Sequence, residues 1–172
     1  MSKLRTANLL GALSVAIADR LEAALKTHPN QNDSAAAALN LIAMEEGCSA
    51  TTLSRYLKLS HPATLRLLDK LEAASLVEIR RGADRRTNAL VLTAAGRARA
   101  LTALQSRCQT LDPIVGNLSG EQRAQLDVIA ETLLRGLTTS SQEGGYICRL
   151  CDEAACPADE CPVHQAALAY AA

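Results

Sequence analysis

Residues 49–96 contain the pattern that most limits what this chain can fold into. Two short amphipathic helical stretches come first, separated by the three residues 58–60. Two runs with the apolar and polar alternation of β-strands come next, at residues 76–80 and 88–92, and the basic hexapeptide 81–86 joins them. The order helix, turn, helix, hairpin predicts a winged helix-turn-helix.

Local signals set the limits of the two short helices. Ser49 and Ser60 are good N-cap residues because a serine hydroxyl accepts a hydrogen bond from an orphan amide of the first turn. Pro62 is tolerated in that first turn, whose amides have no partner inside the helix. The second helix then carries the apolar stripe Leu67, Leu68 and Leu71.

The second helix has a polar and basic face opposite its apolar stripe. A helix of this kind enters the major groove of DNA, and a hairpin beside it contacts the flanking backbone or the minor groove. The candidate DNA-binding residues at this helix are Ser60, His61, Ala63, Thr64, Arg66 and Lys70.

Charge is segregated along the chain, although the net charge is zero. Residues 52–93 contain eight Lys and Arg against four Asp and Glu, whereas residues 140–172 contain one Arg against five acids. A local basic excess of this kind is what a DNA-binding face requires.

The wing and the end of the second helix resemble the MarR family of bacterial transcriptional regulators. Residues 84–96 read DRRTNALVLTAAG, which is similar to the family's wing signature of Asp, any residue, Arg and a closing L-x-L-T-x-x-G. Residues 66–72, RLLDKLE, resemble the end of its recognition helix. The resemblance covers residues 5–138. It departs at Ser75, where the family has Gly, and at Leu65, where the family has a small hydroxyl residue facing DNA.

The resemblance implies a homodimer that binds pseudo-palindromic double-stranded operators, often as a repressor released by a small-molecule effector or by oxidation. Arg86 matches the wing arginine of the family, whose role is to contact the minor groove or the backbone. Arg85 is a second candidate contact, with a solvated charge as the alternative. We expect a mainly α fold: a winged helix-turn-helix with a two-stranded β wing, and long N- and C-terminal dimerisation helices.

The N-terminal stretch imitates a signal peptide, with basic residues before an apolar run that ends in Ala16-Ile17-Ala18. The alternative is an amphipathic helix over residues 4–26, because one helical stripe continues past the apparent cleavage point: Leu10, Leu13, Ile17, Leu21 and Leu25. Since a cleaved peptide has no reason to keep phase with the residues beyond its cleavage site, we favour the helix. We therefore expect a cytoplasmic protein without a membrane partner.

Long helices are also expected after the wing. One begins at Thr93, continues to about Leu111, and is broken at Asp112-Pro113. Its heptad-like seam consists of Leu101, Leu104, Cys108, Leu111, Val115 and Leu118. A capping-box pattern at residues 119–122 begins a last helix that ends near Leu137. Such long apolar stripes around one compact unit favour a homodimer.

The sequence changes character after residue 138. Residues 138–145 have the composition of a flexible linker. Four cysteines then fall within 14 residues, Cys148, Cys151, Cys156 and Cys161, followed by His164 as an alternative ligand. Thiolates at this spacing predict a metal centre, either zinc or an iron–sulfur cluster, which spacing alone does not separate. Reversible disulfides and inert thiols remain the alternatives.

These patterns divide the chain into a dimerisation helix and loop (1–32), a winged helix-turn-helix (33–96), C-terminal dimerisation helices (97–138) and a linker with a cysteine-rich metal-binding tail (139–172). No enzyme constellation appears. Cys48 and Cys108 are expected to be buried thiols, with a low-pKa sensor as the alternative for Cys48.

Three functions therefore compete. The first is a dimeric DNA-binding regulator whose tail senses redox state or metal. The second is the same regulator responding to a small organic ligand, with a purely structural zinc tail. The third is a redox or electron-transfer protein.

Overall fold

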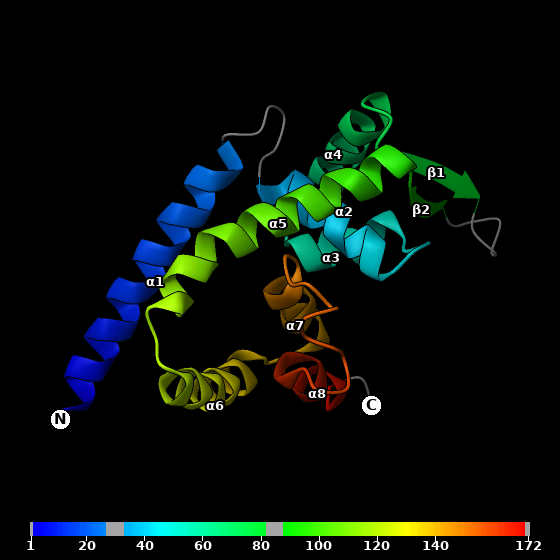
Figure 1. Ribbon diagram of the computed structural model, residues 1–172. Coiled ribbons are helices and arrows are strands. Elements are labelled where there is room, and N and C mark those ends of the chain that lie inside the picture. The colour runs from blue at the N-terminus through cyan, green and yellow to red at the C-terminus, as the bar shows by residue number, and fades with distance from the viewer. Residues whose placement is uncertain (1, 27–32, 82–87, 171–172) are drawn as a thin grey trace.

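The computed structural model describes residues 2–26, 33–81 and 88–170. Within those ranges the order is α1 (Lys3–Lys26), α2 (Asp33–Met44), α3 (Ala50–Leu57), α4 (His61–Ala73), β1 (Val77–Arg81), β2 (Asn88–Leu92), α5 (Ala94–Gly116), α6 (Gly120–Leu137), α7 (Ser141–Cys148) and α8 (Pro162–Leu168). The fold is mainly helical with one two-stranded antiparallel sheet, as predicted. Helix α5 crosses the molecule, with α1 and α2 packed against it (Figure 1).

The winged-helix unit, residues 33–92, comprises α2, α3, α4 and the hairpin. Its core is made of small and branched aliphatic side chains, with Leu39, Ile42, Leu53, Leu68 and Leu90 almost fully buried. Both predicted serine caps are present, because the Ser49 Oγ accepts from the Thr52 amide at 3.1 Å and the Ser60 Oγ from the Ala63 amide at 3.4 Å. The helix-turn-helix is therefore built as the sequence predicts.

The hairpin is joined tightly to the start of α5. Val77 pairs with Leu92 and Arg81 with Asn88 in an antiparallel register. The Thr93 hydroxyl donates to the Ser75 carbonyl at 2.7 Å and accepts from the Gly96 amide at 3.0 Å. A Cβ on Gly96 would collide with the Leu76 carbonyl, so the glycine allows α5 to approach the strand this closely.

The predicted helix break at Asp112-Pro113 is wrong, since α5 continues to Gly116 with Pro113 inside it. Proline removes one backbone hydrogen bond and crowds the carbonyl four residues earlier. Pro113 lies in the last turn of α5, and this end of the helix packs beside α1, where Pro113 and Leu13 line one hollow. Tertiary packing there outweighs the local cost of the proline.

The predicted flexible linker is also wrong over residues 138–145. Thr138 is buried, and Ser140 caps α7 by accepting from the Glu143 amide at 3.0 Å. The two glycines that suggested flexibility serve close packing instead. A Cβ on Gly144 would lie 2.9 Å from the Ala167 side chain, and one on Gly145 would collide with the Tyr56 ring.

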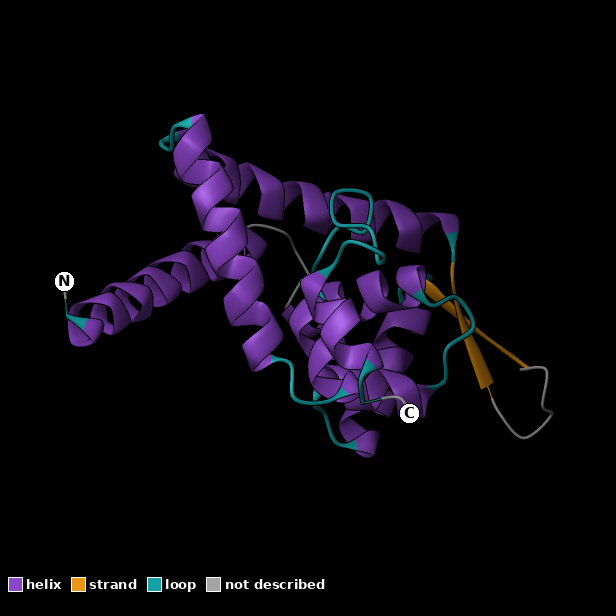
Figure 2. Ribbon diagram, turned by 90° about the horizontal axis from the view of Figure 1, so that it is seen from below, coloured by secondary structure: helices purple, strands orange, loops and turns teal. Residues whose placement is uncertain are grey.

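The first and sixth helices leave much apolar surface uncovered. Helix α1 is continuous from Lys3 to Lys26, as the helix interpretation of the N-terminal stretch requires, and it projects away from the winged-helix unit (Figure 2). Leu13 on α1 is 47% exposed, and Ile129 on α6 is 56% exposed. In the part of the chain that the structure describes, no helix combines the length and hydropathy needed to cross a membrane.

Candidate nucleic-acid interface and cysteine site

Helix α4 presents an exposed face on which His61, Leu65, Arg66 and Lys70 lie. Ser60 is exposed at the helix start, and Ala63 is half-buried. The face combines two cations, an imidazole, an apolar side chain and the carboxylate of Asp69. It matches the polar and basic face predicted for a groove-binding helix, with Leu65 added to it.

Thr64 is the exception among the predicted contact residues, because it is fully buried. Its hydroxyl donates to the Ser60 carbonyl at 3.2 Å. Thr64 lies four residues before Leu68 and seven before Leu71, so helical periodicity places it on the buried stripe rather than on the outer face. Thr64 therefore does not reach a base edge from this position.

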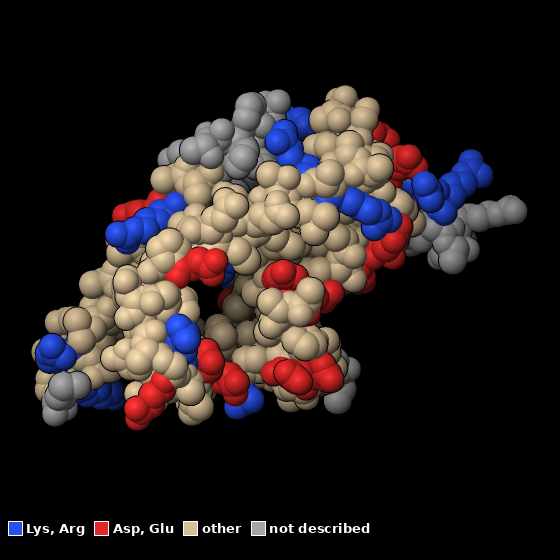
Figure 3. Space-filling view, in the orientation of Figure 1, with Lys and Arg blue, Asp and Glu red and all other residues tan. Residues whose placement is uncertain are grey.

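The hairpin carries exposed arginines beside α4. Arg80 forms an ion pair with Glu78 at 2.7 Å, and Arg81 is exposed at the end of β1. Basic side chains extend beside the hairpin with acidic side chains close to them, and further acidic side chains lie over α6 and the C-terminal part of the chain (Figure 3). Arg85 and Arg86, the predicted wing contacts, lie outside the described residues.

Lys58 has a role that the sequence did not indicate. It ends α3 in the left-handed conformation, with φ of 52°. Its Nζ lies 2.8 Å from the Glu143 Oε2 of α7 and 4.1 Å from the centre of the Tyr146 ring. Lys58 therefore links the helix-turn-helix to the cysteine segment, residues 138–170, through an ion pair and a cation–π contact.

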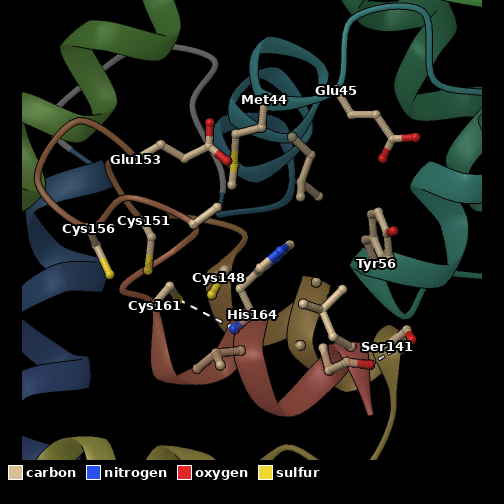
Figure 4. A pocket seen from close by; sticks show the side chains of 17 residues that line it. Met44, Glu45, Tyr56, Ser141, Cys148, Cys151, Glu153, Cys156, Cys161 and His164 are labelled. Atoms are coloured by element: carbon tan, nitrogen blue, oxygen red, sulfur yellow. Dashed lines mark hydrogen bonds between the residues drawn. The ribbon is translucent and has the colours of Figure 1, made fainter. Parts of the chain in front are cut away.

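The four predicted metal ligands gather at one place in the cysteine segment. Cys148 ends α7, Cys161 is the N-cap of α8, and Cys151 and Cys156 lie in the loop between them (Figure 4). The Cys161 sulfur accepts from the His164 backbone amide at 3.5 Å. The His164 ring extends into the adjacent cavity.

The thiols interact with one another in pairs. A hydrogen bond with Cys151, together with burial, raises the pKa of the Cys148 thiol. The same hydrogen bond lowers the pKa of Cys151, and the positive charges of Arg107 and Arg149 act in the same direction. Burial and a hydrogen bond with Cys161 raise the pKa of Cys156. Cys151 is therefore more readily ionised than Cys148 or Cys156, and thiolate is the form that binds metal.

The cysteine side chains are nevertheless not arranged in the coordination geometry of a metal site. Among the described residues, no three His, Cys, Asp or Glu side chains are arranged to hold a metal ion. The paired contacts form a chain from Cys151 through Cys148 and Cys161 to Cys156. Tetrahedral zinc with bonds of about 2.3 Å places its sulfurs about 3.8 Å apart, which is a sulfur hydrogen-bonding distance. Coordination of one metal ion by all four sulfurs would therefore require the cysteine side chains to rearrange.

A cavity of about 380 Å³ lies between the cysteines and the winged-helix unit. All four cysteines line it on one side, and Met44 and Tyr56 line it on the other (Figure 4). Leu41 also belongs to the lining. A separate hollow of about 550 Å³ lies between α1 and α5, where Ile17 and Ile114 are among its lining residues.

Asn40 is a buried polar residue with two hydrogen-bond partners in the cysteine segment. It is 4% exposed, and its side-chain amide donates to the carbonyls of Arg149 at 3.2 Å and Cys151 at 2.9 Å. The only sequence signal was an asparagine within the apolar run of α2. Such a residue needs a partner, but the sequence did not indicate where the partner would be.

The two isolated cysteines differ from each other. Cys48 is buried, and burial together with the negative charge of Glu45 raises its pKa to about 11, so the sensor alternative is wrong for the folded protomer. Cys108 was expected to be buried but is exposed. The buried positions of α5 are Gly96, Ala100 and Ala103, which belong to a different helical phase from the seam that contains Cys108.

Comparisons with known proteins show what the winged-helix unit is similar to. A model of the MarR family matches residues 32–87. A MarR family protein from Bacillus stearothermophilus has a TM-score of 0.71 and 20% identity over 81% of this chain and 99% of its own. MepR, a transcription regulator of the Staphylococcus aureus multidrug efflux pump MepA, has a TM-score of 0.65 and 18% identity over 76% and 97%.

A Mycobacterium tuberculosis MarR family protein solved in complex with DNA is also similar, with a TM-score of 0.61 and 23% identity over 74% of this chain and 95% of its own. No curated protein sequence matches the chain significantly. In each comparison, nearly the whole length of the solved structure aligns with this chain. About a fifth to a quarter of this chain has no counterpart in those structures.

Proposed function

We propose that the chain is a sequence-specific DNA-binding transcriptional regulator of the MarR family, whose model matches residues 32–87. It acts as a repressor in the cytoplasm and binds a pseudo-palindromic operator. The supporting observation is the exposed face of α4, on which Arg66 and Lys70 stand beside an arginine-bearing hairpin. A relative of the same fold was solved in complex with DNA.

We propose further that the protein is a homodimer. The apolar side chains that α1 and α6 leave exposed support this, because so much uncovered aliphatic surface on two long helices is typical of an interface. Two recognition helices in one dimer would meet successive major grooves about 34 Å apart.

The proposal includes a metal centre of zinc or an iron–sulfur cluster held by Cys148, Cys151, Cys156 and Cys161, with His164 as the alternative ligand. Convergence of four thiols beside one cavity supports it. The paired sulfur contacts favour a single zinc ion, since a cluster places iron and sulfide between its cysteines and holds them further apart.

The regulator itself is tested by selection of a duplex from a randomised DNA pool with the purified full chain. Enrichment of one sequence with two related half-sites supports the proposal. Retention of the whole pool without enrichment, or no retention at low salt, would refute sequence-specific binding.

The metal is tested by colour and elemental analysis of protein purified without oxygen. A brown protein indicates a cluster, and a colourless protein with one zinc per protomer indicates zinc. Cys151→Ser and Cys161→Ser should lose the metal, whereas Cys108→Ser on α5 should retain it. Full metal content in both tail variants would refute the ligand assignment.

A second candidate keeps the regulator and assigns its response to a small organic effector. The hollow between α1 and α5 favours this, because Leu13, Ile17 and Ile114 in its lining suit the apolar part of an organic molecule. The tail would then be a structural zinc site. Thermal stabilisation of the protein by an apolar compound, abolished by Ile17→Arg, would support it.

A further inference from the structure

The cysteine segment touches two parts of the protein that the rest of the chain keeps apart. Helix α7 packs against α3, the first helix of the helix-turn-helix, and α8 packs against α6 (Figure 1). Helix α6 is one of the two helices whose exposed apolar residues support the dimer proposal. The segment therefore spans from the DNA-reading part to the dimerisation part.

The contact with α3 is both polar and close-packed. Glu143 binds the Lys58 ammonium at 2.8 and 3.0 Å, and Tyr146 lies beneath the same cation. One turn before the end of α7, Gly145 lies directly against the Tyr56 ring, with no room for a Cβ. Lys58 and Tyr56 both belong to the end of α3 that leads into α4, so a shift of α7 acts where the recognition helix begins.

A second contact fixes the loop after α7. Asn40 of α2 donates to two backbone carbonyls of this loop, those of Arg149 and Cys151. Arg149 in turn lies 4.0 Å from the centre of the Tyr146 ring and donates to the Tyr146 carbonyl at 2.7 Å. The first cysteine pair is therefore attached to the winged-helix unit by hydrogen bonds rather than by apolar packing alone.

The cysteines stand where the two helices of the segment meet. Cys148 is the last residue of α7, and Cys161 immediately precedes α8. An ion bound by both sulfurs would hold the end of α7 to the beginning of α8. Without it, the joint depends on weak thiol contacts and on packing of the two short helices.

We propose that the cysteine segment is a strut that fixes the winged-helix unit relative to α6, and that the metal bound by its four cysteines keeps this strut rigid. The proposal rests on the proposed function, of which it specifies the regulation. A dimer with fixed recognition helices loses less conformational freedom when it binds two half-sites, so it binds the operator more tightly. Loss of the metal loosens the strut and weakens binding.

The first measurement needs no DNA. Amide hydrogen exchange is compared between zinc-loaded protein and protein from which zinc has been removed by a chelator under reducing conditions. We expect exchange in α3 to rise at least threefold when zinc is removed. A zinc ion that stabilises only the loop around the cysteines would change amide exchange in that loop and leave exchange in α3 unchanged. That result would overturn the strut proposal. Protein that binds neither zinc nor iron would also overturn it.

The second measurement is affinity for the duplex selected by the zinc-loaded protein, before and after removal of zinc. We expect the Kd of the wild type to rise about tenfold when zinc is removed. Gly145→Ala, which forces α7 away from Tyr56, should raise the Kd to a similar extent with zinc still bound, and zinc removal should then add little. Gly120→Ala is the matched control, because a Cβ there meets nothing within 4 Å.

Glu143→Gln tests the same contact if Gly145→Ala does not fold. Glu143→Gln should raise the Kd for the duplex about threefold and reduce the change in Kd that zinc removal causes. Asp159→Asn is its control, because it makes the same charge change at an exposed site of the segment. It should change neither the Kd nor the effect of zinc removal. Wild-type affinity and a full zinc response in both test variants would overturn the strut. Failure to select any duplex would refute the proposed function instead, and the exchange experiment would still decide the strut.

Discussion

Ser75 has a left-handed backbone, with φ of 56°, between α4 and β1. The residue is a serine where the resembled family has glycine, and the structure shows why glycine suits this position. A non-glycine residue in this conformation costs about 1 kcal/mol. Ser75→Gly should therefore raise the free energy of unfolding by about 0.5–1 kcal/mol, measured by urea denaturation. Ser106→Gly inside α5 should lower it, and a loss of stability in both variants would contradict the conformational argument.

Arg66 is an exposed cation on the face of α4 that we propose meets DNA. Arginine can form two hydrogen bonds with guanine, and such a pair contributes about 1–3 kcal/mol of discrimination. Arg66→Ala should weaken binding to the selected duplex by that amount and weaken binding to random DNA less. Arg123→Ala on α6 removes the same charge far from α4 and should have little effect. Equal losses on both duplexes would show that Arg66 contacts only phosphate.

Cys48 makes stability depend on pH in the alkaline range. Its pKa is raised from 9.0 to about 11, so the folded state holds a proton that the unfolded state releases above pH 9. Stability is therefore unaffected below pH 9 and falls between pH 9 and 11, by about 2–3 kcal/mol. The difference in unfolding free energy between the wild type and Cys48→Ala, followed over this range, should show that slope. Parallel curves would exclude the effect.

At the scale of elements, the sequence predicted most of the winged-helix unit because local signals agree with burial there. The serine caps, the spacing of apolar residues every 3.6 positions in α4 and their alternation in the hairpin all predict the elements that the structure contains. Thr64 was misplaced because a polar residue at a buried helical position looks like a surface residue in a sequence. Its hydroxyl is satisfied by the carbonyl of Ser60, within its own helix.

The errors after α5 have a common physical cause. Pro113 and the glycines of α7 were interpreted from local propensity, which favours a break and a linker. The structure places Pro113 beside α1 and Gly145 against Tyr56, and neither neighbour is close in sequence. Contacts of this kind, like those of Asn40 and Lys58, depend on how helices that are distant in sequence pack together. They produce no repeating pattern in the sequence from which they could be predicted.

At the scale of the whole molecule, the exposed faces of α1 and α6 predict a dimer. Sedimentation at micromolar concentration should show twice the mass of the chain. Ile129→Lys, which places a charge on the apolar stripe of α6, should shift the equilibrium toward monomer and weaken operator binding together with it. Asp127→Lys introduces the same lysine on another side of the helix and should leave a dimer. A stable wild-type monomer that still binds the operator would refute the interface.

The contact between Asn40 and the Cys151 carbonyl joins residues 111 positions apart. During synthesis the chain emerges from its N-terminus, and units fold as they become available. The whole winged-helix unit therefore leaves the ribosome well before the cysteines that attach to it. If the cysteine segment is the strut proposed above, a newly made protomer has its winged-helix unit before it has the strut, and the length of that interval depends on how quickly translation ends and the proposed metal is delivered.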